Sequence, residues 1–338
     1  MTFIILGAGA IGCYIGGRLA STGNKTVLVG RPRTLDGLAV AGLRVSDQEG
    51  FDSQIAPERL HLASTLQEAL DTLGEHEGTP TILVCVKGTG TAEVAQDIAQ
   101  CCTPGTVVIS LQNGLGNAAR IRSVAPLMQV HAGMVPYTVM WRNDHHVHRA
   151  NVGVLQVEST TRTQALASTM VAAGLPMELH DDMPAVQWGK LLLNLMNPVN
   201  ALADIPIREQ LLQRDYRQVF AALQTEALGV LKAAGIKPAK VAAVAPAMVP
   251  HILRLPDWLF TRVAAGMLKT DPGAQTSMCA DLRNGRPTEI DDLCGEVVRL
   301  AQLQKMDAPK NSAVVALIKN HQRGRRWSGS ELRRELRI

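Results

Sequence analysis

Short apolar runs alternate with helical patterns through the first half of the chain. The first run, Thr2–Leu6, ends at a glycine, as a buried parallel strand does. A helical pattern over Ala10–Thr22 follows, and a second apolar run at Thr26–Val29 predicts the next strand. Two further apolar runs, 81–86 and 106–111, also predict strands. This alternation favours a doubly wound, mostly parallel α/β sheet, which is a Rossmann-type domain.

Three other segments also look extended. They are residues 43–56, 130–141 and 152–158. We expect them to form hairpins or edge strands beside the parallel sheet.

The pattern changes after about residue 180, where strand-like runs disappear. Long helical patterns follow at 185–196, 216–234 and 290–304. The charged pair Asp181-Asp182 and the proline at 184 are typical of a helix start. We therefore expect a dinucleotide-binding domain over 1–181 and an all-helical domain over 182–338.

Composition excludes several classes of protein. A net charge of +4 on 338 residues does not indicate a nucleic-acid-binding protein, although it suits an anionic ligand. The apolar stretches are too short or too broken by proline to span a membrane, and no targeting segment is evident, so we expect a cytoplasmic protein. The six cysteines form no C-x-x-C pair and no zinc spacing, which favours reduced thiols.

A glycine motif joins the first predicted strand to the first helix. The sequence Gly7-Ala8-Gly9-Ala10-Ile11-Gly12 fits G-x-G-x-x-G in the context that dinucleotide binding requires. Gly7 would make the tight turn, Gly9 would let a pyrophosphate approach the backbone, and Gly12 would let helix and strand pack closely. The helix N-terminus at Ala10 and Ile11 would face the phosphates. The alternative is a glycine-rich turn without function.

The end of the second predicted strand indicates which dinucleotide binds. An acidic residue there would bind the ribose 2′-hydroxyl of NAD, but the chain reads Val29-Gly30-Arg31-Pro32-Arg33. Arg31 and Arg33 could hold a 2′-phosphate, so NADP is the expected cofactor. The alternative is a pair of solvated surface arginines. FAD also binds to such glycine motifs, but no other feature of the sequence indicates a flavin.

Four further segments carry polar residues at places where chemistry is expected. Lys87 ends the strand-like run Leu83–Val86, and Asn113 lies in a Gln-Asn-Gly sequence after the next run. The third segment runs from Lys190 to Asn194, and the fourth holds Ser277, Asp281 and the sequence Thr288–Asp291. Together with the glycine motif, and in this order over nearly the whole chain, these segments resemble the ketopantoate reductase (2-dehydropantoate 2-reductase) family.

The resemblance implies a fold and an activity. It implies an N-terminal Rossmann domain, a C-terminal helical domain of the 6-phosphogluconate-dehydrogenase type, and an active site in the cleft between them. The implied reaction is the NADPH-dependent reduction of ketopantoate to pantoate, which belongs to pantothenate and coenzyme A biosynthesis. The expected partner is then a small 2-oxo acid, with no nucleic acid, membrane or bound metal. The sequence leaves a homodimer open.

Lys87 and Asn113 each follow a predicted strand. Ligands of open α/β sheets bind outside the carboxyl ends of the strands, so both residues should border the nicotinamide and the substrate. The resemblance makes Lys87 a cofactor and substrate contact. It makes Asn113 a ligand for the nicotinamide ribose and the reacting region. The alternatives are an exposed lysine and an ordinary Asn-Gly turn.

Lys190, Asn194 and Asn197 share one face of a predicted helix. That face either extends into water or lines a polar pocket. Hydride transfer to a ketone leaves negative charge on the oxygen, which a cationic acid stabilises and protonates. The resemblance gives this role to Lys190 and makes Asn194 a substrate ligand.

The family's second asparagine falls at Pro198 in this chain, and Asn197 precedes it. A proline inside a helix frees a backbone carbonyl and can kink the helix. Either Asn197 substitutes for the missing side chain, or the pocket has another shape and the substrate is a different 2-oxo acid.

The last expected site residues lie near the predicted helix at 290–304. By resemblance, Glu289 contacts the lysine and the substrate hydroxyl, and Ser277 binds the substrate carboxylate. Asp281 is expected to be structural. The alternative for Glu289 is an acidic residue in the first turn of a helix, where it complements the helix dipole.

Two other features are interpreted as ordinary structure. The stretch 144–148, Asp-His-His-Val-His, is expected to be a solvated hairpin loop rather than a metal site. The basic run 323–327 is weak as a nucleic-acid signal, and Ser328 with Glu331 predicts a capping box that opens a final surface helix. Two rival functions remain beside a reductase of another 2-oxo acid, namely a non-catalytic NADP-binding regulator and a nucleic-acid-binding module.

Overall fold

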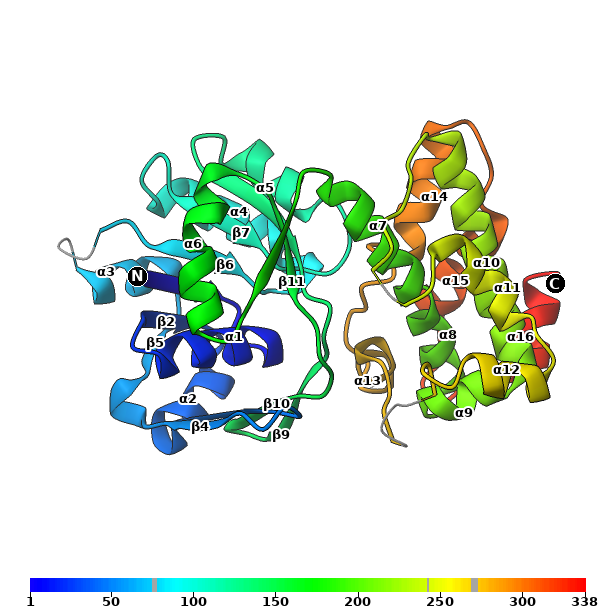
Figure 1. Cartoon of the computed structure of the whole chain (residues 1–338), viewed down its shortest axis with the longest axis horizontal. Coiled ribbons are helices and arrows are strands. Elements are labelled where there is room, and N and C mark those ends of the chain that lie inside the picture. Colours follow the sequence, from blue (N-terminus) through cyan, green and yellow to red (C-terminus); the bar gives the residue numbers. More distant parts are fainter. Residues whose placement is uncertain (75–77, 242, 269–272) are drawn as a thin grey trace. The chain divides into compact units, whose positions relative to one another are not determined.

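A computed structural model describes residues 1–74, 78–241, 243–268 and 273–338. The chain divides into two compact units, Met1–Met183 and Pro184–Ile338 (Figure 1).

The first unit contains an eight-stranded sheet in the order β12-β11-β8-β7-β6-β1-β2-β5. Neighbouring strands run parallel except for β11 and β8, which pair antiparallel. The strands are β1 (Thr2–Leu6), β2 (Lys25–Val29), β5 (His61–Ala63), β6 (Thr81–Val84), β7 (Val107–Ser110), β8 (Gln129–Met134), β11 (Leu155–Glu158) and β12 (Met177–His180). Because the chain leaves β1 toward β2 and later returns to β1's other side as β6, the order of strands reverses between β1 and β6. Ligands of doubly wound sheets bind at such a reversal.

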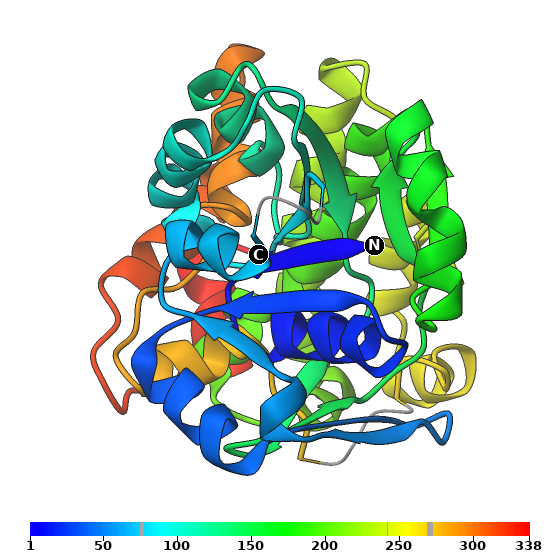
Figure 2. The same ribbon diagram turned by 90° about the vertical axis from the view of Figure 1, so that its left-hand side faces the viewer.

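The apolar runs form strands because both faces of the sheet are covered. Phe3, Ile4 and Ile5 are completely buried, as expected of a strand in the middle of a parallel sheet. Figure 2 shows β1 and β2 side by side with α1 next to them. The helices of this unit are α1 (Ala10–Ser21), α2 (Pro32–Ala41), α3 (Leu66–Leu73), α4 (Thr91–Cys101), α5 (Asn117–Val124) and α6 (Thr161–Ala172). The predicted Rossmann-type domain is confirmed.

A second, four-stranded sheet packs beside α1 in the order β4-β3-β10-β9. Its strands are β3 (Leu43–Asp47), β4 (Asp52–Ile55), β9 (Val139–Asn143) and β10 (His146–Arg149). Buried Asp47 accepts hydrogen bonds from Arg18 of α1 and from Arg149 of β10, both at 3.1 Å. These ion pairs join α1 to the small sheet.

The expectation of hairpins or edge strands is confirmed for 43–56, where β3 and β4 pair antiparallel. It is wrong for β8 and β11. β8 lies inside the large sheet between β7 and β11, and β11 lies between β8 and β12. A single sequence does not reveal this, because a strand's neighbours are set by pairing with distant segments.

The described residues of the second unit form helices joined by turns and loops, with no strand among them, which confirms the expected helical domain. Figure 1 shows α10 near α14 and α15, with which it packs. The helices are α7 (Met183–Asn194), α8 (Met196–Ala203), α9 (Ile207–Leu212), α10 (Arg214–Ala233), α11 (Val249–Leu253), α12 (Asp257–Val263), α13 (Ser277–Arg283), α14 (Cys294–Leu303), α15 (Pro309–Lys319) and α16 (Gly329–Glu335). The helix expected over 290–304 begins only at Cys294.

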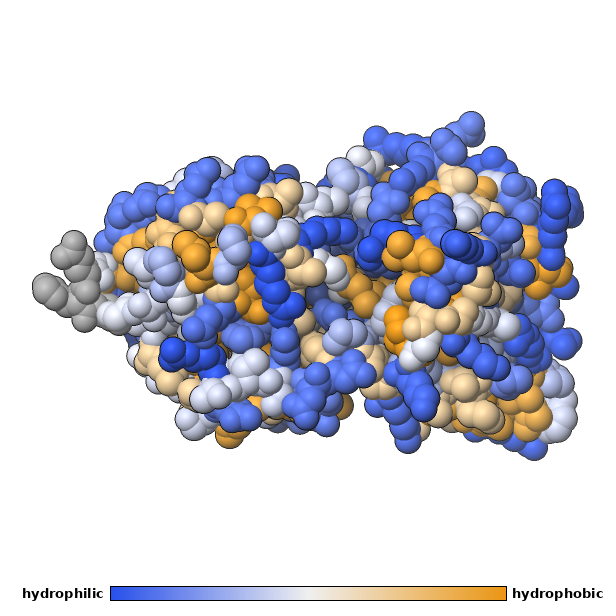
Figure 3. All heavy atoms as spheres, turned by 90° about the horizontal axis from the view of Figure 1, so that it is seen from above, coloured by the Kyte–Doolittle hydropathy of each residue, from blue (hydrophilic) through white to orange (hydrophobic). Residues whose placement is uncertain are grey.

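The surface, the helix lengths and the cysteines can be compared with what the composition predicted. On the face drawn in Figure 3, hydrophobic residues form small groups among hydrophilic ones. None of the described helices is long and apolar enough to cross a membrane. All six cysteines are free thiols.

Candidate functional site

The glycine turn after β1 is constrained by its own backbone. Gly7 has a φ of +112°, a conformation that favours glycine, and a Cβ there would come within 2.7 Å of the Val86 nitrogen. A Cβ on Gly12 would lie 2.0 Å from the Gly7 carbonyl oxygen. Gly7 therefore permits the close approach of the chain after β6, and Gly12 permits the tight start of α1.

Gly9 has a different reason to be glycine. It is exposed, and a Cβ built on it would meet no atom of the described chain within 4 Å. Gly9 is also the N-cap of α1, where no side chain caps the helix and no acidic residue lies in the first turn. The first amide groups of a helix have no acceptor within it, so this terminus presents open donors to an anion. Open space beside uncapped amides fits the diphosphate of a dinucleotide.

Arg31 lies at the junction of β2 and α2. It is the N-cap of α2, and both Arg31 and Arg33 are exposed. No acidic residue occupies the first turn of α2, and neither arginine forms an ion pair within the described residues. The arrangement places positive charge and a helix N-terminus at the strand end where the ribose of a dinucleotide is expected.

Lys87 and Asn113 follow β6 and β7, which are neighbours in the sheet. Both residues are exposed. The Asn113 carbonyl accepts a hydrogen bond from Asn117 Nδ2 at 2.8 Å. The first unit thus brings Gly7, Lys87 and Asn113 to the carboxyl ends of three consecutive strands, β1, β6 and β7.

Lys190 lies on α7 beside the buried side chains of Leu191 and Leu192. Its own side chain is half-buried, and burial lowers the pKa of its ammonium group. Removing a cation from water favours its neutral form, so the lysine becomes a stronger acid.

The single continuous helix expected through Lys190, Asn194 and Asn197 is wrong. Asn194 is the last residue of α7, and Asn197 belongs to α8, which begins at Met196. Pro198 lacks the backbone N–H that would bond to the Asn194 carbonyl, which accounts for the interruption at Leu195. Asn194 and Asn197 are both half-buried.

Asn197 and Ser277 are linked through Thr276. Ser277 is exposed and opens α13, whose N-cap is Thr276. The Thr276 hydroxyl lies 3.5 Å from the Asn197 carbonyl and 3.2 Å from Asn200 Oδ1, which also accepts the Thr276 amide at 3.0 Å. Asn200 is fully buried. Sequence reasoning missed Asn200 and Thr276, although an asparagine in an otherwise apolar helix segment was an available signal.

Glu289 lies outside any helix, five positions before the start of α14 at Cys294. The interpretation of Glu289 as an acid in a first helical turn is therefore wrong, because Glu296 holds that place. Glu289 is half-buried. Asp281 is buried on α13 and forms an ion pair with Arg286 at 3.1 Å.

The histidine-rich stretch 144–148 forms a hairpin, but only Asp144 and His145 lie in its turn. His146 and His148 belong to β10, and one nitrogen of each ring lies 2.8 Å from Ser46 Oγ. Within the described residues, no group of three or more metal-ligating side chains comes together. The predicted capping box of α16 is confirmed, with Ser328 and Glu331 bonding each other's backbone.

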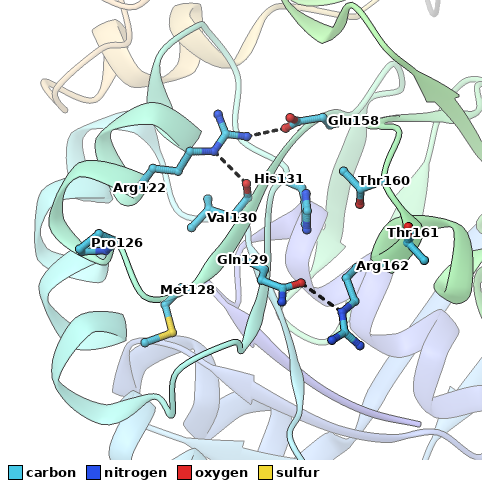
Figure 4. A pocket seen from close by; sticks show the side chains of 10 residues that line it. All are labelled: Arg122, Pro126, Met128, Gln129, Val130, His131, Glu158, Thr160, Thr161 and Arg162. Atoms are coloured by element: carbon cyan, nitrogen blue, oxygen red, sulfur yellow. Dashed lines mark hydrogen bonds and ion pairs between the residues drawn. The ribbon is translucent and has the colours of Figure 1, made fainter.

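A pocket of about 650 Å³ in the first unit contains none of the expected site residues. Figure 4 shows it at the start of β8, with Arg122 beside Glu158 on one side. β11 pairs with β8 only at Met134 and Gly133, so β8 has a free edge before them. Arg122 Nε donates to the Val130 carbonyl and Glu158 accepts the Ala132 amide, both at 2.9 Å. Arg122 and Glu158 thus bond backbone groups of β8 that no neighbouring strand pairs with. This structural role explains why the two charged residues line the pocket.

Comparison with known proteins settles the family. Residues 3–161 match the model described as "Ketopantoate reductase PanE/ApbA", and residues 182–322 match "Ketopantoate reductase PanE/ApbA C terminal". A PanE/ApbA family ketopantoate reductase from Ralstonia eutropha JMP134 is 30% identical, with a TM-score of 0.78 over 94% of this chain and 97% of that one. The chain belongs to the ketopantoate reductase family. It is therefore an oxidoreductase of the pyridine-nucleotide-dependent type.

Curated relatives extend this similarity over most of the chain. The 2-dehydropantoate 2-reductase of Pyrococcus horikoshii is 26% identical over 94% of this chain and 97% of its own length. The 2-dehydropantoate 2-reductase of Mesorhizobium japonicum is 27% identical over the same shares, 94% and 97%. Both units of the chain thus have counterparts in these reductases.

Proposed function

We propose that the protein reduces the ketone of ketopantoate to give pantoate, with NADPH as the reductant, in pantothenate and coenzyme A biosynthesis. The match of both halves of the chain to the two family models carries the proposal. The positions of the motif residues also support it. Lys87 and Asn113 follow the strands β6 and β7, and Ser277 opens the helix α13. The named 2-dehydropantoate 2-reductases among its relatives support the same substrate.

The cofactor would bind to the first unit. The turn at Gly7, Gly9 and Gly12, with the amides of Ala10 and Ile11, would hold the diphosphate. Arg31 would pair with the 2′-phosphate, because a guanidinium binds phosphate through charge-assisted hydrogen bonds. When bound, NADPH supplies the hydride that reduces the ketone carbon.

Lys190 would act on the ketone oxygen. As the carbon gains the hydride, the electron pair of the C=O π bond moves to oxygen, and the Lys190 ammonium stabilises that charge and then donates its proton. The O–H bond of pantoate forms while an N–H bond of Lys190 breaks. Water then returns a proton to the lysine. The lowered pKa of the buried ammonium makes this transfer easier.

The remaining residues would bind and orient the substrate. Ser277 would donate to the carboxylate, and Glu289 would accept from the substrate hydroxyl and hold Lys190. Asn113 and Lys87 would contact the nicotinamide ribose and the reacting region. Asn194 and Asn197 would complete the polar lining.

The test is a substrate panel. Oxidation of NADPH should be fastest with ketopantoate among 2-oxo acids of similar size, and product analysis should identify pantoate. A higher kcat/KM for another 2-oxo acid would assign the chain to that substrate instead. No oxidation with any 2-oxo acid, despite tight NADPH binding, would favour a non-catalytic NADP-binding regulator.

A further inference from the structure

Four buried polar side chains connect the loops that follow β6 and β7. Ser110 Oγ donates to Gln112 Oε1 at 2.9 Å, and Gln112 Nε2 donates to Thr91 Oγ1 at 2.8 Å. Thr91 Oγ1 donates to Asn117 Oδ1 at 3.0 Å. Asn117 Nδ2 then donates to the Asn113 carbonyl at 2.8 Å. We call Thr91, Ser110, Gln112 and Asn117 the buried polar chain.

Burial makes each of these bonds matter. The exposed fraction is 1% for Thr91, 3% for Ser110, 5% for Gln112 and 2% for Asn117. Water cannot replace a bond lost here, so an unpaired group would bear the full cost of desolvation. In this chain, each group that accepts one hydrogen bond donates the next one. Hydrogen bonds arranged in this way polarise and strengthen one another.

The hydroxyl of Thr91 is the link between the two loops. Thr91 opens α4, and the short 3-10 turn before it begins just after Lys87, whose carbonyl accepts the Gly90 amide at 2.8 Å. Asn117 opens α5 and holds the backbone of Asn113. One hydroxyl therefore accepts from the Gln112 side chain and donates to Asn117. The loops that carry Lys87 and Asn113 are joined through it.

We propose that Thr91, together with Gln112 and Asn117, is a positioning element that fixes the Lys87 and Asn113 loops relative to each other. Its effect on turnover rests on the function proposed above, in which Lys87 and Asn113 contact the cofactor and the substrate. None of the three need touch the reacting atoms. Misplacing a contact group by about 1 Å can cost about 100-fold in rate, so a fixed loop pair serves the reaction.

The test is Thr91→Val in the full-length protein, with Thr106→Val as the matched control. Both threonines are buried, at 1% and 2% exposed. The Thr106 hydroxyl also makes a short bond, 2.7 Å to the Thr103 carbonyl. Thr106 precedes β7, at the opposite end of that strand from Asn113. Each substitution thus replaces a buried, hydrogen-bonded hydroxyl by a methyl group, but only Thr91 lies between the Lys87 and Asn113 loops.

Both variants should lose thermal stability, and Thr91→Val should lose more, because its hydroxyl bonds both Gln112 and Asn117. Thr91→Val should also lose about 10- to 100-fold in kcat with ketopantoate, the scale of a misplaced contact group. Thr91→Ser, which keeps the hydroxyl, should restore most of that rate. A Thr91→Val enzyme with the same kcat as Thr106→Val would overturn the positioning role.

Amide hydrogen exchange without substrate gives a readout that does not need turnover. In Thr91→Val, exchange should rise together in residues 86–91 and 111–117, and Thr106→Val should leave both segments unchanged. If the wild type does not reduce ketopantoate but this joint response is seen, the positioning role stands and the proposed function fails. If the two segments do not respond to Thr91→Val, the positioning role fails whatever the activity.

Discussion

The three glycines of the turn after β1 are glycine for different reasons. Gly7 and Gly12 are required by the fold, since a Cβ on either would meet backbone atoms of the same unit. Gly9 is not required by the fold, because the space beside it is open. A glycine that the chain itself does not need indicates that something else must approach there. The diphosphate of NADP is the group that we propose.

Arg31 gives a prediction about cofactor choice. Arg31→Ala should weaken NADPH binding by about 1–3 kcal/mol, the scale of a lost charge-assisted hydrogen bond. NADH lacks the 2′-phosphate, so its affinity should barely change and it serves as the internal control. A fluorescence titration of both cofactors measures this. Equal losses for NADPH and NADH would show that Arg31 does not bind the 2′-phosphate.

Lys190 gives a prediction about pH. Its acid form is lost as the pH rises through its pKa, and burial lowers that pKa. The kcat should therefore fall on the alkaline side with a midpoint below the ordinary lysine value of about 10.4. Lys190→Ala should bind NADPH normally and lose at least about 100-fold in kcat, the lower range for removing a general acid.

Lys190→Arg is the matched variant for this prediction, because it keeps the charge but cannot give up a proton near neutral pH. The alkaline fall should disappear in it. A profile that keeps the same alkaline midpoint in Lys190→Arg would assign that titration to another group.

The sequence predicted that Lys87 and Asn113 follow strands of the sheet, because each comes just after an apolar run. It did not point to Thr91, Asn117 or Asn200. These are ordinary polar residues of helices, and a sequence does not say that they are buried. Their roles arise only when the fold brings distant segments together and removes water from them.

At the scale of elements, the strands beside the glycine turn could be predicted because they are short, fully apolar and bounded by glycine. The edges of the sheet could not. β8 pairs with β7 and β11, and neither partner is evident from the alternation within β8 itself. The start of α14 was also misplaced, because the residues before Cys294 form turns with apolar spacing like that of a helix.

The break between α7 and α8 leads to a prediction about substrate. The break at Leu195 places Asn194 at the end of α7 and Asn197 in the first turn of α8, directly before Pro198. If the polar lining still pairs the substrate hydroxyl, ketopantoate should exceed 2-oxoisovalerate by well over about tenfold in kcat/KM, because an analogue without the hydroxyl leaves buried polar groups unpaired. 2-Oxoisovalerate has the same branched carbon and lacks only the hydroxymethyl group.

Asn197→Ala provides the control for this comparison. It should lower kcat/KM for ketopantoate more than for 2-oxoisovalerate if Asn197 contacts the hydroxyl. Equal turnover of the two substrates by the wild type would mean that the hydroxyl is not recognised. The chain would then be a member of the family that acts on another 2-oxo acid.

At the scale of the whole molecule, the expected site residues are divided between the two units. The glycine turn, Arg31, Lys87 and Asn113 belong to Met1–Met183, and Lys190, Ser277 and Glu289 belong to Pro184–Ile338. A cofactor that binds only the first group should stabilise that unit alone. At 100 times its Kd, a ligand stabilises the state that binds it by about 2.7 kcal/mol.

Hydrogen exchange can follow both units at once. NADP⁺ alone should slow amide exchange around the glycine turn and β2, and it should leave α13 nearly unchanged. NADP⁺ with ketopantoate cannot react, because both are oxidised, so this mixture should form a stable complex. We predict that it slows exchange at the Ser277 end of α13 and at Glu289 as well, since those residues are proposed to bind the substrate. Protection confined to the first unit in this complex would contradict the substrate roles of Ser277 and Glu289, while leaving the cofactor assignment intact.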